Sequence, residues 1–293
     1  MKITGDPLIF KAHDSHINAI KFSPDGRILL SAGMDNLVKL WSVPDWKHTG
    51  TLSGHEKSVN VLNLFSDGTR LLTTSSDRTI RIWDLKTRCE LQQLDIVGST
   101  ALLSPDEETL AIIDNPWMKI VNLENTASVE RIKPFPKRTI AIAFSTQPQY
   151  LAVGGQGDDI IIYDTLENSR VHTIERAHQG YVLSLSFSPD SKQLVSVGYE
   201  KRLCFWDQST WNLLGELPLQ NQGVQSLTFS PNGNYLAIAS DHRITLVDAQ
   251  SMEIKQNVDL KPKGVYCLAF SPDGKWLACG AADKRIRIWV IEP

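Results

Sequence analysis

Cysteine is scarce in this chain, and the positions of its cysteines exclude two classes of site. The 293 residues contain four of them, Cys89, Cys204, Cys267 and Cys279, with no CxxC pair and no histidine at a zinc-ligand spacing. The sequence therefore predicts neither a structural zinc site nor a disulfide framework. We expect the four thiols to be reduced residues of the core.

Long hydrophobic runs are also missing. No window approaches the roughly 18 apolar residues of a membrane-spanning helix. Near the N-terminus, Gly5, Asp6, Pro7 and Lys11 interrupt the chain before an apolar segment can accumulate, so no signal peptide is predicted. These two absences make the cytoplasm the expected location, and no membrane contact is expected.

An excess of one charge sign is lacking too. The chain has 30 Lys and Arg against 33 Asp and Glu, a formal net charge of -3. This balance excludes a protein whose whole surface attracts nucleic acid or anionic lipid, but it leaves room for a local basic patch. Glycine (18) and proline (14) are too few for a disordered tract, and 42% of the residues are apolar. The chain can therefore bury a substantial core.

The chain does contain seven copies of one segment of about 42 residues. The clearest marker is a turn that resembles Ser-Pro-Asp-Gly and lies between two apolar runs. Its first residues are 42, 39, 41, 43, 42 and 41 positions apart and are Phe22, Leu64, Leu103, Phe144, Phe187, Phe229 and Phe270. Repeats throughout residues 1–293 predict a single repeat domain and leave no room for a second one.

Each copy is typical of β-structure, because apolar residues alternate with a period of two on both sides of the turn. In the turn, Pro presets φ, Asp bonds its own backbone, and Gly adopts the positive φ that closes the hairpin. A four-stranded sheet with two apolar faces must stack against neighbouring sheets. The sequence therefore predicts an all-β fold, a seven-bladed β-propeller of four-stranded antiparallel blades.

The phase of the repeats predicts how the ring closes. The N-terminal segment precedes the first copy at the place where every other copy has the fourth strand of its predecessor. We therefore expect the N-terminal strand to complete the last blade, with residues 8–10 pairing with residues 285–290.

These residues resemble the tryptophan-aspartate (WD) repeat family of seven-bladed propellers over the whole chain. Trp83-Asp84 and Trp206-Asp207 match the dipeptide that names the family, and Gly54-His55 matches its opening dipeptide. The resemblance implies a buried His, Ser/Thr, Asp, Trp tetrad in each well-preserved blade. The implied tetrads are His13, Ser31, Asp35 and Trp41 in blade one, His55, Thr73, Asp77 and Trp83 in blade two, and His178, Ser196, Glu200 and Trp206 in blade five.

In the other copies the tetrad is incomplete. Val121, Tyr163 and Val247 stand where Trp belongs in blades three, four and six, and blade seven has Lys261 and Cys279 in the His and Ser positions. We expect these blades to depend more on apolar packing.

Two patterns resemble chemistry but favour a structural interpretation. His13, Ser31 and Asp35 have the composition of a catalytic triad, yet the set recurs in blade two with Thr, and buried polar groups need partners in any case. Residues 154–159 (GGQGDD) match one calcium-binding repeat unit or a phosphate-binding loop, but the pattern occurs once. We interpret it as the turn between the second and third strands of blade four. No metal, cofactor or enzymatic activity is predicted, and a hydrolase in the channel is the least favoured alternative.

Function is then expected from the surface. The resemblance implies that partners bind the top face through three positions per blade beside the channel, which hold small polar residues in blades two and six. The large side chains at such positions are Arg138, Ile140, Tyr181, Leu183, Tyr199, Tyr266 and Met34. Tyr and Arg dominate binding hot spots, so the hypothesis is a peptide or loop docked over blades four and five. The alternative is that these side chains pack on one another and plug the channel.

A basic segment offers a second candidate surface. Arg131, Lys133, Lys137 and Arg138, with Phe135 among them, predict an exposed connection between blades three and four that could contact nucleic acid or a phosphorylated ligand. Acidic residues close by in the sequence favour a solvated loop instead.

Trp117 lies outside the position where the repeat places Trp, so it either anchors a partner or fills the space of the missing tetrad in blade three. Taken together, the sequence predicts a non-catalytic scaffold or adaptor subunit of a multi-subunit assembly, with protein or peptide partners and with nucleic acid disfavoured.

Overall fold

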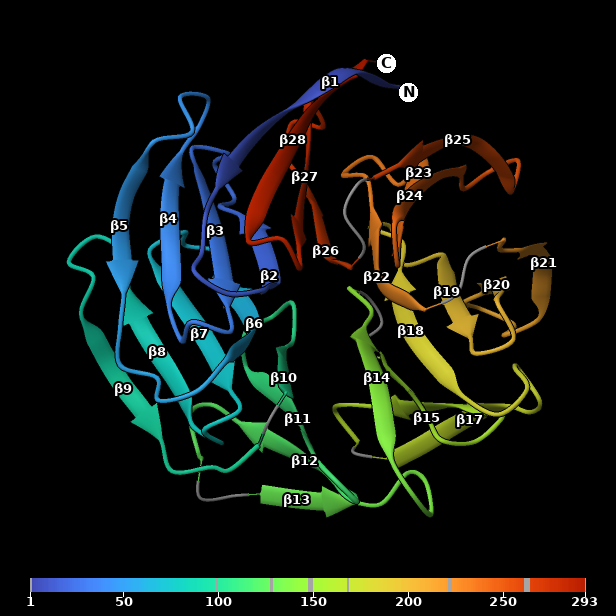
Figure 1. The fold of residues 1–293 in the computed structure, drawn as a ribbon. Coiled ribbons are helices and arrows are strands. Elements are labelled where there is room, and N and C mark those ends of the chain that lie inside the picture. Colours follow the sequence, from blue (N-terminus) through green and yellow to red (C-terminus); the bar gives the residue numbers. More distant parts are fainter. Residues whose placement is uncertain are drawn as a thin grey trace.

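Seven β-sheets stand around a central axis (Figure 1). The computed structural model describes residues 2–98, 100–126, 129–146, 150–167, 169–220, 223–260 and 264–292. In these ranges the chain forms 28 strands and no helix, and each sheet has four strands in antiparallel order. The predicted seven-bladed propeller is confirmed. Since the described part of the chain has no helix, it also has none that could cross a membrane.

The first four blades run from their inner to their outer strands as follows. Blade one has β2 (Ile17–Phe22), β3 (Ile28–Gly33), β4 (Val38–Ser42) and β5 (His48–Leu52). Blade two has β6 (Val59–Leu64), β7 (Arg70–Ser75), β8 (Ile80–Asp84) and β9 (Glu90–Leu94). Blade three has β10 (Thr100–Leu103), β11 (Thr109–Asp114), β12 (Trp117–Asn122) and β13 (Val129–Ile132). Blade four has β14 (Thr139–Phe144), β15 (Tyr150–Gly155), β16 (Ile160–Asp164) and β17 (Ser169–Ile174).

The last three blades follow the same order. Blade five has β18 (Val182–Phe187), β19 (Gln193–Gly198), β20 (Arg202–Asp207) and β21 (Leu213–Pro218). Blade six has β22 (Val224–Phe229), β23 (Tyr235–Ser240), β24 (Arg243–Asp248) and β25 (Glu253–Asp259). Blade seven has β26 (Val265–Phe270), β27 (Trp276–Ala281), β28 (Arg285–Glu292) and, from the other end of the chain, β1 (Lys2–Lys11).

The turn after the inner strand of blade one has the predicted chemistry. In blade one, Ser23 Oγ donates to Asp25 Oδ1 at 2.6 Å, and the Arg27 amide donates to the same oxygen at 3.0 Å. Gly26 adopts a φ of +70°, the left-handed conformation that glycine accepts without a steric cost. Blades three and five place Glu107 and Ser191 in this conformation, at φ of 66° and 56°. These turns fix the register between the first two strands of a blade.

The N-terminal strand closes the ring as predicted. Leu8 pairs with Ile288 and Phe10 with Ile286, so β1 is the outer strand of blade seven, and Figure 1 shows both ends of the chain side by side. Pairing continues beyond the predicted segment to Lys2 and Glu292, after an irregularity between Thr4 and Leu8. Backbone hydrogen bonds therefore join the two ends of the polypeptide.

The hydrophobic core lies between the blades. One cluster joins Ala278 and Ile288 of blade seven to Ile17, Leu29 and Trp41 of blade one, and similar clusters fill the other seams. The second strands are almost completely buried, as the pattern of β7 and β19 shows. Because the sheets use both faces for packing, the outer strands, the connections and the channel side of the inner strands are left for contacts with other molecules.

The prediction that all four cysteines lie in the core is wrong for one of them. Cys204, Cys267 and Cys279 are buried, whereas Cys89 is exposed in the connection between β8 and β9. Burial raises the pKa of Cys204 and of Cys279 to about 12, so these two thiols stay protonated at neutral pH. A connection at the outside of a blade does not provide such burial.

Candidate functional site

The structure brings the four tetrad residues of blade one together inside the sheet. Trp41 Nε1 donates to Ser31 Oγ at 2.9 Å, and Ser31 Oγ lies 2.8 Å from His13 Nε2. His13 Nδ1 lies 2.8 Å from Asp35 Oδ1 and donates to it. A neutral imidazole with its proton on Nδ1 satisfies these contacts, and burial lowers the pKa of His13, which favours this neutral form.

Blades two and five repeat the arrangement. His55 lies 2.7 Å from Thr73 Oγ1 and 2.9 Å from Asp77 Oδ2, and Trp83 Nε1 donates to the same threonine at 2.8 Å. In blade five, His178 lies 2.7 Å from Ser196 Oγ and 2.6 Å from Glu200 Oε1, and Trp206 Nε1 donates to Ser196 at 2.8 Å. Ser31, Thr73 and Ser196 are 0% exposed, so no substrate can reach their hydroxyl groups. The geometry is that of a buried hydrogen-bond network that holds the strands of a blade together, and not that of a hydrolytic triad.

The glutamate of blade five needs more room than the aspartates of blades one and two. Its second oxygen, Glu200 Oε2, is buried without a hydrogen-bond partner among the described residues. Gly198 makes the room, because a Cβ at this position would collide with Glu200 Oε2 and with the ring of His178. Blade two has Ser75 at the same place beside the shorter Asp77.

The blades without a complete tetrad keep the same register. Val121 pairs with Leu110, Tyr163 with Leu151 and Val247 with Leu236, as Trp41 pairs with Leu29. In blade three, Lys119 is buried, and its Nζ lies 2.7 Å from Asp114 Oδ2 and 2.7 Å from the Val97 carbonyl oxygen. In blade seven, Arg287 pairs with Asp283 at 2.6 Å, while Lys261 lies outside the described residues.

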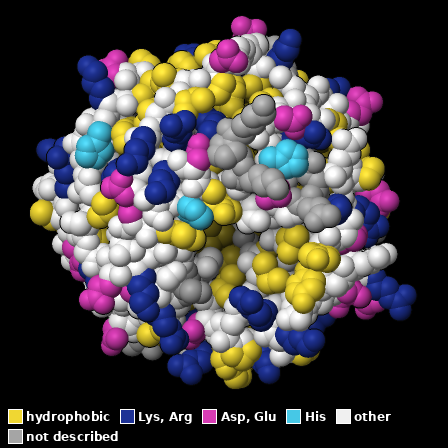
Figure 2. Space-filling view, viewed as in Figure 1, with side chains coloured by type: hydrophobic (Ala, Val, Ile, Leu, Met, Phe, Trp, Pro, Cys, Tyr) yellow, Lys and Arg dark blue, Asp and Glu magenta, His cyan; other side chains and the backbone are white. Residues whose placement is uncertain are grey.

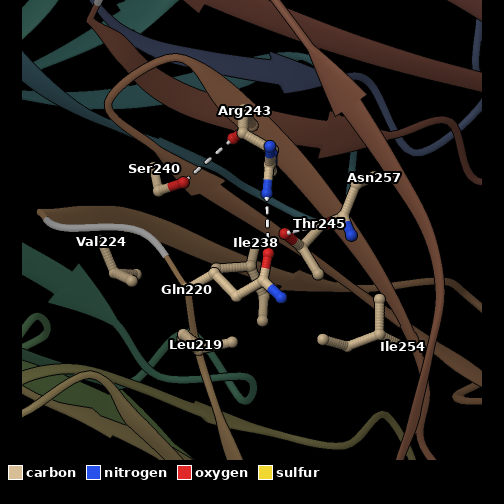
Figure 3. A pocket seen from close by; sticks show the side chains of 9 residues that line it. All are labelled: Leu219, Gln220, Val224, Ile238, Ser240, Arg243, Thr245, Ile254 and Asn257. Atoms are coloured by element: carbon tan, nitrogen blue, oxygen red, sulfur yellow. Dashed lines mark hydrogen bonds between the residues drawn. The ribbon is translucent and has the colours of Figure 1, made fainter.

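The tetrad is replaced in blade six. Ile238 occupies the Ser position, and Gln220, four residues before Val224 as His13 is before Ile17, occupies the His position. A cavity of about 10 Å³ beside them is lined by Arg243, Thr245 and Asn257 (Figure 3). Thr245 Oγ1 donates to Asn257 Oδ1 at 2.9 Å. A cavity of this size holds at most one water molecule and is too small for an organic ligand.

The basic segment differs from the prediction in two respects. Phe135 is 5% exposed and packs with Met118, Leu151 and Ile161 between blades three and four. It precedes Tyr163 by the same 28 residues that separate His13 from Trp41, so it fills the histidine position of blade four and cannot stack on a base. Arg131 lies in β13 and not in a loop.

The other members of the basic segment lie on the surface. Arg131, Lys133, Lys137 and Arg138 are exposed, and none of them belongs to an ion pair in the described part of the chain. Trp117, at the start of β12, is 44% exposed, and Lys133 Nζ lies 6.0 Å from the centre of its ring. Trp117 therefore does not fill the space of the missing tetrad.

A hollow of about 670 Å³ opens beside the channel over blades four, five and six. Its lining includes Ile140, Leu183 and Tyr199, together with Gln225 and Asp241. Figure 2 shows the depression at the centre of the ring and hydrophobic side chains gathered next to it, over β14 and β18. The aliphatic side chains Ile140 and Leu183 thus come from blades four and five, and the polar ones are Lys201 of blade five and Gln225 and Asp241 of blade six.

Tyr199 lines this hollow, whereas Tyr181 packs against Tyr199 and is not part of the lining. The rings of Tyr181 and Tyr199 are 5.8 Å apart at 57°, and Gln156 Nε2 donates to the Tyr181 hydroxyl at 3.0 Å. Tyr199 is nevertheless 69% exposed. The side chains do pack on one another, as one alternative predicted, but they leave the hollow open.

The remaining predicted top-face residues, Arg138, Tyr266 and Met34, do not line the hollow. Arg138 is exposed, and its carbonyl oxygen accepts a hydrogen bond from the Gln156 amide at 2.7 Å, next to the hollow. Tyr266 packs against His16 with ring centres 5.8 Å apart, and Met34 is exposed in blade one. The lining residues of blade six were not predicted, because a glycine such as Gly223 has no side chain that indicates a binding surface.

Residues 156–159 form the predicted turn between β15 and β16, whereas Gly154 and Gly155 are the last residues of β15. Asp158 Oδ1 accepts a hydrogen bond from the Gly180 amide at 2.8 Å, and Asp159 Oδ1 accepts one from the Arg176 amide at 2.9 Å. Both carboxylates thus support the neighbouring connection. In the described part of the chain, no three His, Cys, Asp or Glu side chains are placed to hold a metal ion.

The chain belongs to the WD-repeat family. The family model described as "WD domain, G-beta repeat" matches residues 7–42, 46–84, 168–207 and 256–290. Three of these four matches end one residue after the tetrad tryptophan of blades one, two and five, and the fourth ends one residue after Trp289. A second model, "Anaphase-promoting complex subunit 4 WD40 domain", matches residues 202–271.

Several fungal proteins share part of the sequence. Protein hir-1 of Neurospora crassa is 31% identical over 121 residues, which is 35% of this chain and 12% of the relative. Protein HIR1 of Eremothecium gossypii is 28% identical over 121 residues (36% and 15%), and Protein hir1 of Aspergillus fumigatus is 32% identical over 120 residues (35% and 12%). The chain therefore spans only a small part of the length of these relatives.

Proposed function

We propose that the protein is a non-catalytic interaction scaffold that binds a peptide or loop of a partner protein in the hollow over blades four, five and six. Membership of the WD-repeat family supports a scaffold role in general. The observation that carries the proposal is the open hollow of about 670 Å³ with Ile140, Leu183 and Tyr199 in its lining. The cytoplasmic location and the incorporation into a larger assembly stay predictions.

The chemistry of the hollow fits an apolar anchor with polar neighbours. Ile140 and Leu183 offer aliphatic contact, and Tyr199 offers a rigid ring that loses little conformational entropy on binding. Lys201 of blade five and Gln225 and Asp241 of blade six provide hydrogen-bonding groups. A partner segment would bury an aliphatic or aromatic residue against blades four and five and direct its backbone toward blade six.

The test is cross-linked affinity capture with three forms of the protein. We expect the double variant Leu183→Ala/Tyr199→Ala to lose the partner, and we expect cross-links of the wild-type protein to map to blades four to six. Leu166→Ala removes a 77% exposed leucine from the connection between β16 and β17 and is the matched control. Equal capture by the double variant and the wild-type protein would refute the proposal.

A second candidate function is recognition of nucleic acid or a phosphorylated ligand by Arg131, Lys133, Lys137 and Arg138. The observation that favours it is the absence of ion-pair partners for these four side chains in the described residues. The burial of Phe135 weakens it, because the segment loses its stacking side chain. Phosphate-driven binding falls steeply with rising salt, whereas binding in the hollow should change little, so affinity measured at several salt concentrations distinguishes the two.

A further inference from the structure

Three exposed cations lie in the connection between blades three and four. Lys133, Lys137 and Arg138 belong to the segment that leads from β13 to β14, and all three are exposed. We call these three residues the basic ridge. Figure 2 shows Lys and Arg side chains next to the hydrophobic ones that gather beside the central depression.

One end of the basic ridge adjoins the hollow. Arg138 precedes Ile140, which lines the hollow, by two residues, so their Cα atoms are at most about 7 Å apart. The Arg138 carbonyl oxygen accepts a hydrogen bond from the Gln156 amide, and Gln156 Nε2 donates to the Tyr181 hydroxyl. The backbone at Arg138 is therefore held at the blade-four end of the hollow.

The other end of the basic ridge lies beside Trp117. Lys133 Nζ is 6.0 Å from the centre of the Trp117 ring, and Trp117 is 44% exposed. The side chain of Asn115 ties the turn before Trp117 to the start of β14. Its Nδ2 donates to the Thr139 carbonyl oxygen at 3.3 Å, and its Oδ1 accepts from the Thr139 amide at 2.9 Å. Trp117 and the basic ridge are thus parts of one surface.

The basic ridge has no acidic partner in the described part of the chain. None of its three side chains forms an ion pair there. Asp114, at the end of β11, is already paired with Lys119 at 2.7 Å and with Arg78 at 3.1 Å. The ridge cations are hydrated, so they are not a burden on the fold. They are a local positive potential that attracts an acidic partner.

The hollow alone does not favour a partner of either charge. Its lining holds one cation, Lys201, and one anion, Asp241. A partner segment in extended conformation that places an apolar residue against Ile140 has its next outward-facing neighbour two positions away. That is the spacing from Ile140 to Arg138, so a carboxylate at this position reaches the basic ridge.

We propose that the partner segment bound in the hollow is acidic on the side that points away from blade six, and that its Asp or Glu side chains pair with Arg138, Lys137 and Lys133. This inference rests on the proposed function and names the chemistry of the partner. The Arg138 guanidinium can bind a carboxylate through two parallel hydrogen bonds, whereas the two lysines act as point charges. Because these ion pairs stay exposed, they contribute mainly to specificity and to the rate of association.

A peptide complements this surface better than a nucleic acid does. The burial of Phe135 removes the aromatic side chain within the basic segment, which base stacking would require. Ile140 and Leu183, at the end of the ridge, do not complement a phosphate backbone. A protein segment with acidic residues next to an apolar one uses both the ridge and the hollow.

The test is selection from a display library of random dodecapeptides on the wild-type protein, followed by fluorescence anisotropy with an enriched peptide. We expect enriched peptides to carry Asp or Glu about two positions from an aliphatic or aromatic residue. Lys137→Glu/Arg138→Glu should weaken binding about 5- to 50-fold, because two attractions become repulsions. This variant should bind the same peptide with Lys in place of its acids better than the wild type does. Lys47→Glu/Lys86→Glu makes the same change of charge at two exposed lysines in the connections that follow β4 and β8, and it should bind like the wild type.

A second variant separates this inference from the proposed function. Leu183→Ala/Tyr199→Ala should abolish binding of the same peptide, because it removes part of the lining of the hollow. If this variant loses the peptide while Lys137→Glu/Arg138→Glu keeps the wild-type affinity, the inference is wrong and the proposed function stands. If Leu183→Ala/Tyr199→Ala keeps the peptide, or if no peptide is enriched, both are wrong. Tighter binding of oligothymidine than of the best peptide would also overturn the inference.

Discussion

At the scale of single residues, the tetrads show how a polar group becomes part of a core. Each serine or threonine hydroxyl accepts a hydrogen bond from Trp and lies within hydrogen-bonding distance of His Nε2, and each His Nδ1 contacts an acid. Every member depends on its neighbours because a buried donor or acceptor without a partner is costly. Burial lowers the pKa of the three histidines and so favours the neutral imidazole.

The neutral histidines predict a stability that depends on pH. Burial lowers the pKa of His13, His55 and His178 in the folded protein, so the unfolded chain binds protons first, near pH 6.5. The stabilisation is therefore complete above about pH 6.5 and is lost as the pH falls below it. Urea denaturation should show a free energy of unfolding that decreases from about pH 7.5 to 5.5, by at most about 1.4 kcal/mol per pH unit for each histidine.

Aspartates whose pKa is lowered, such as Asp77, contribute stability that is lost only below about pH 4, so the two effects are separable. A His55→Gln variant should give a shallower dependence on pH. His242→Gln, at a partly exposed histidine, is the control and should leave the dependence unchanged. An equally steep dependence in the His55→Gln protein would contradict the explanation.

The pairing of Gly198 with Glu200 leads to a second prediction at this scale. Gly198→Ala should destabilise the protein by about 1 to 3 kcal/mol, the usual cost of overpacking, because the new methyl group meets Glu200 and His178. Gly198→Ser combined with Glu200→Asp reproduces the pair found in blade two and should recover most of the loss in chemical denaturation. If the single variant is as stable as the wild type, the glycine has no such role.

The sequence predicted the tetrads correctly because their spacing is constant, but it missed the residues that replace them. Phe135 was interpreted as part of a basic loop, although its distance to Tyr163 equals the spacing from His to Trp. The basic residues around Phe135 determined the interpretation of this segment, so the spacing of 28 residues was not recognised.

At the scale of the strand, β1 has two parts that are held differently. Residues 8–11 pair with β28 in regular register, and Phe10 packs on Trp41 with ring centres 4.9 Å apart. Residues 2–4 pair again after the irregularity, and Ile3 is buried there. Gln256 of β25 holds Ile3 from the side: its Oε1 accepts from the Ile3 amide at 2.9 Å, and its Nε2 donates to the Ile3 carbonyl oxygen at 3.0 Å.

The side chain of Gln256 thus takes the place of a backbone partner. Replacing it in Gln256→Ala should increase amide hydrogen exchange of residues 2–4 while residues 8–11 stay protected, because their partners belong to β28. Gln250→Ala, in the turn before β25, is the control. Unchanged exchange at Ile3 would show that the strand pairing alone holds this segment.

The sequence predicted the strand pairing of residues 8–10 but not its extension. Gly5, Asp6 and Pro7 are typical of a break in a strand, and a pattern alone does not show that the chain resumes pairing beyond it. The irregularity between Thr4 and Leu8 absorbs these residues. Conversely, the register of blades three, four and six was predictable without Trp, because the apolar partner on the second strand is conserved among the repeats as leucine.

At the scale of the whole molecule, removal of β1 should open the ring. A protein that begins at Ala12 would expose the edge of β28, with its apolar residues Ile286 and Ile288. Unpaired edge strands of this kind associate with other chains. We expect lower stability and concentration-dependent association, measured by denaturation and by light scattering.

A synthetic peptide of residues 1–11 should reverse both effects when it is added in trans, because it supplies the missing strand. The same peptide with Phe10→Ala should be less effective, since it lacks the ring that packs on Trp41. A shortened protein that stays monomeric and keeps the stability of the wild type would contradict this account of ring closure.

The pairing of β1 with β28 also has a consequence for biosynthesis. Among the strands of the ring, the ribosome makes β1 before all others and β28 after them, and at about 5 to 20 residues per second the two are separated by roughly 15 to 60 s. During that interval the nascent chain can complete the six blades whose strands are all local in sequence, while its leading segment has no place to dock. The ring can therefore close only after β28 has left the ribosome and has become available to pair with β1.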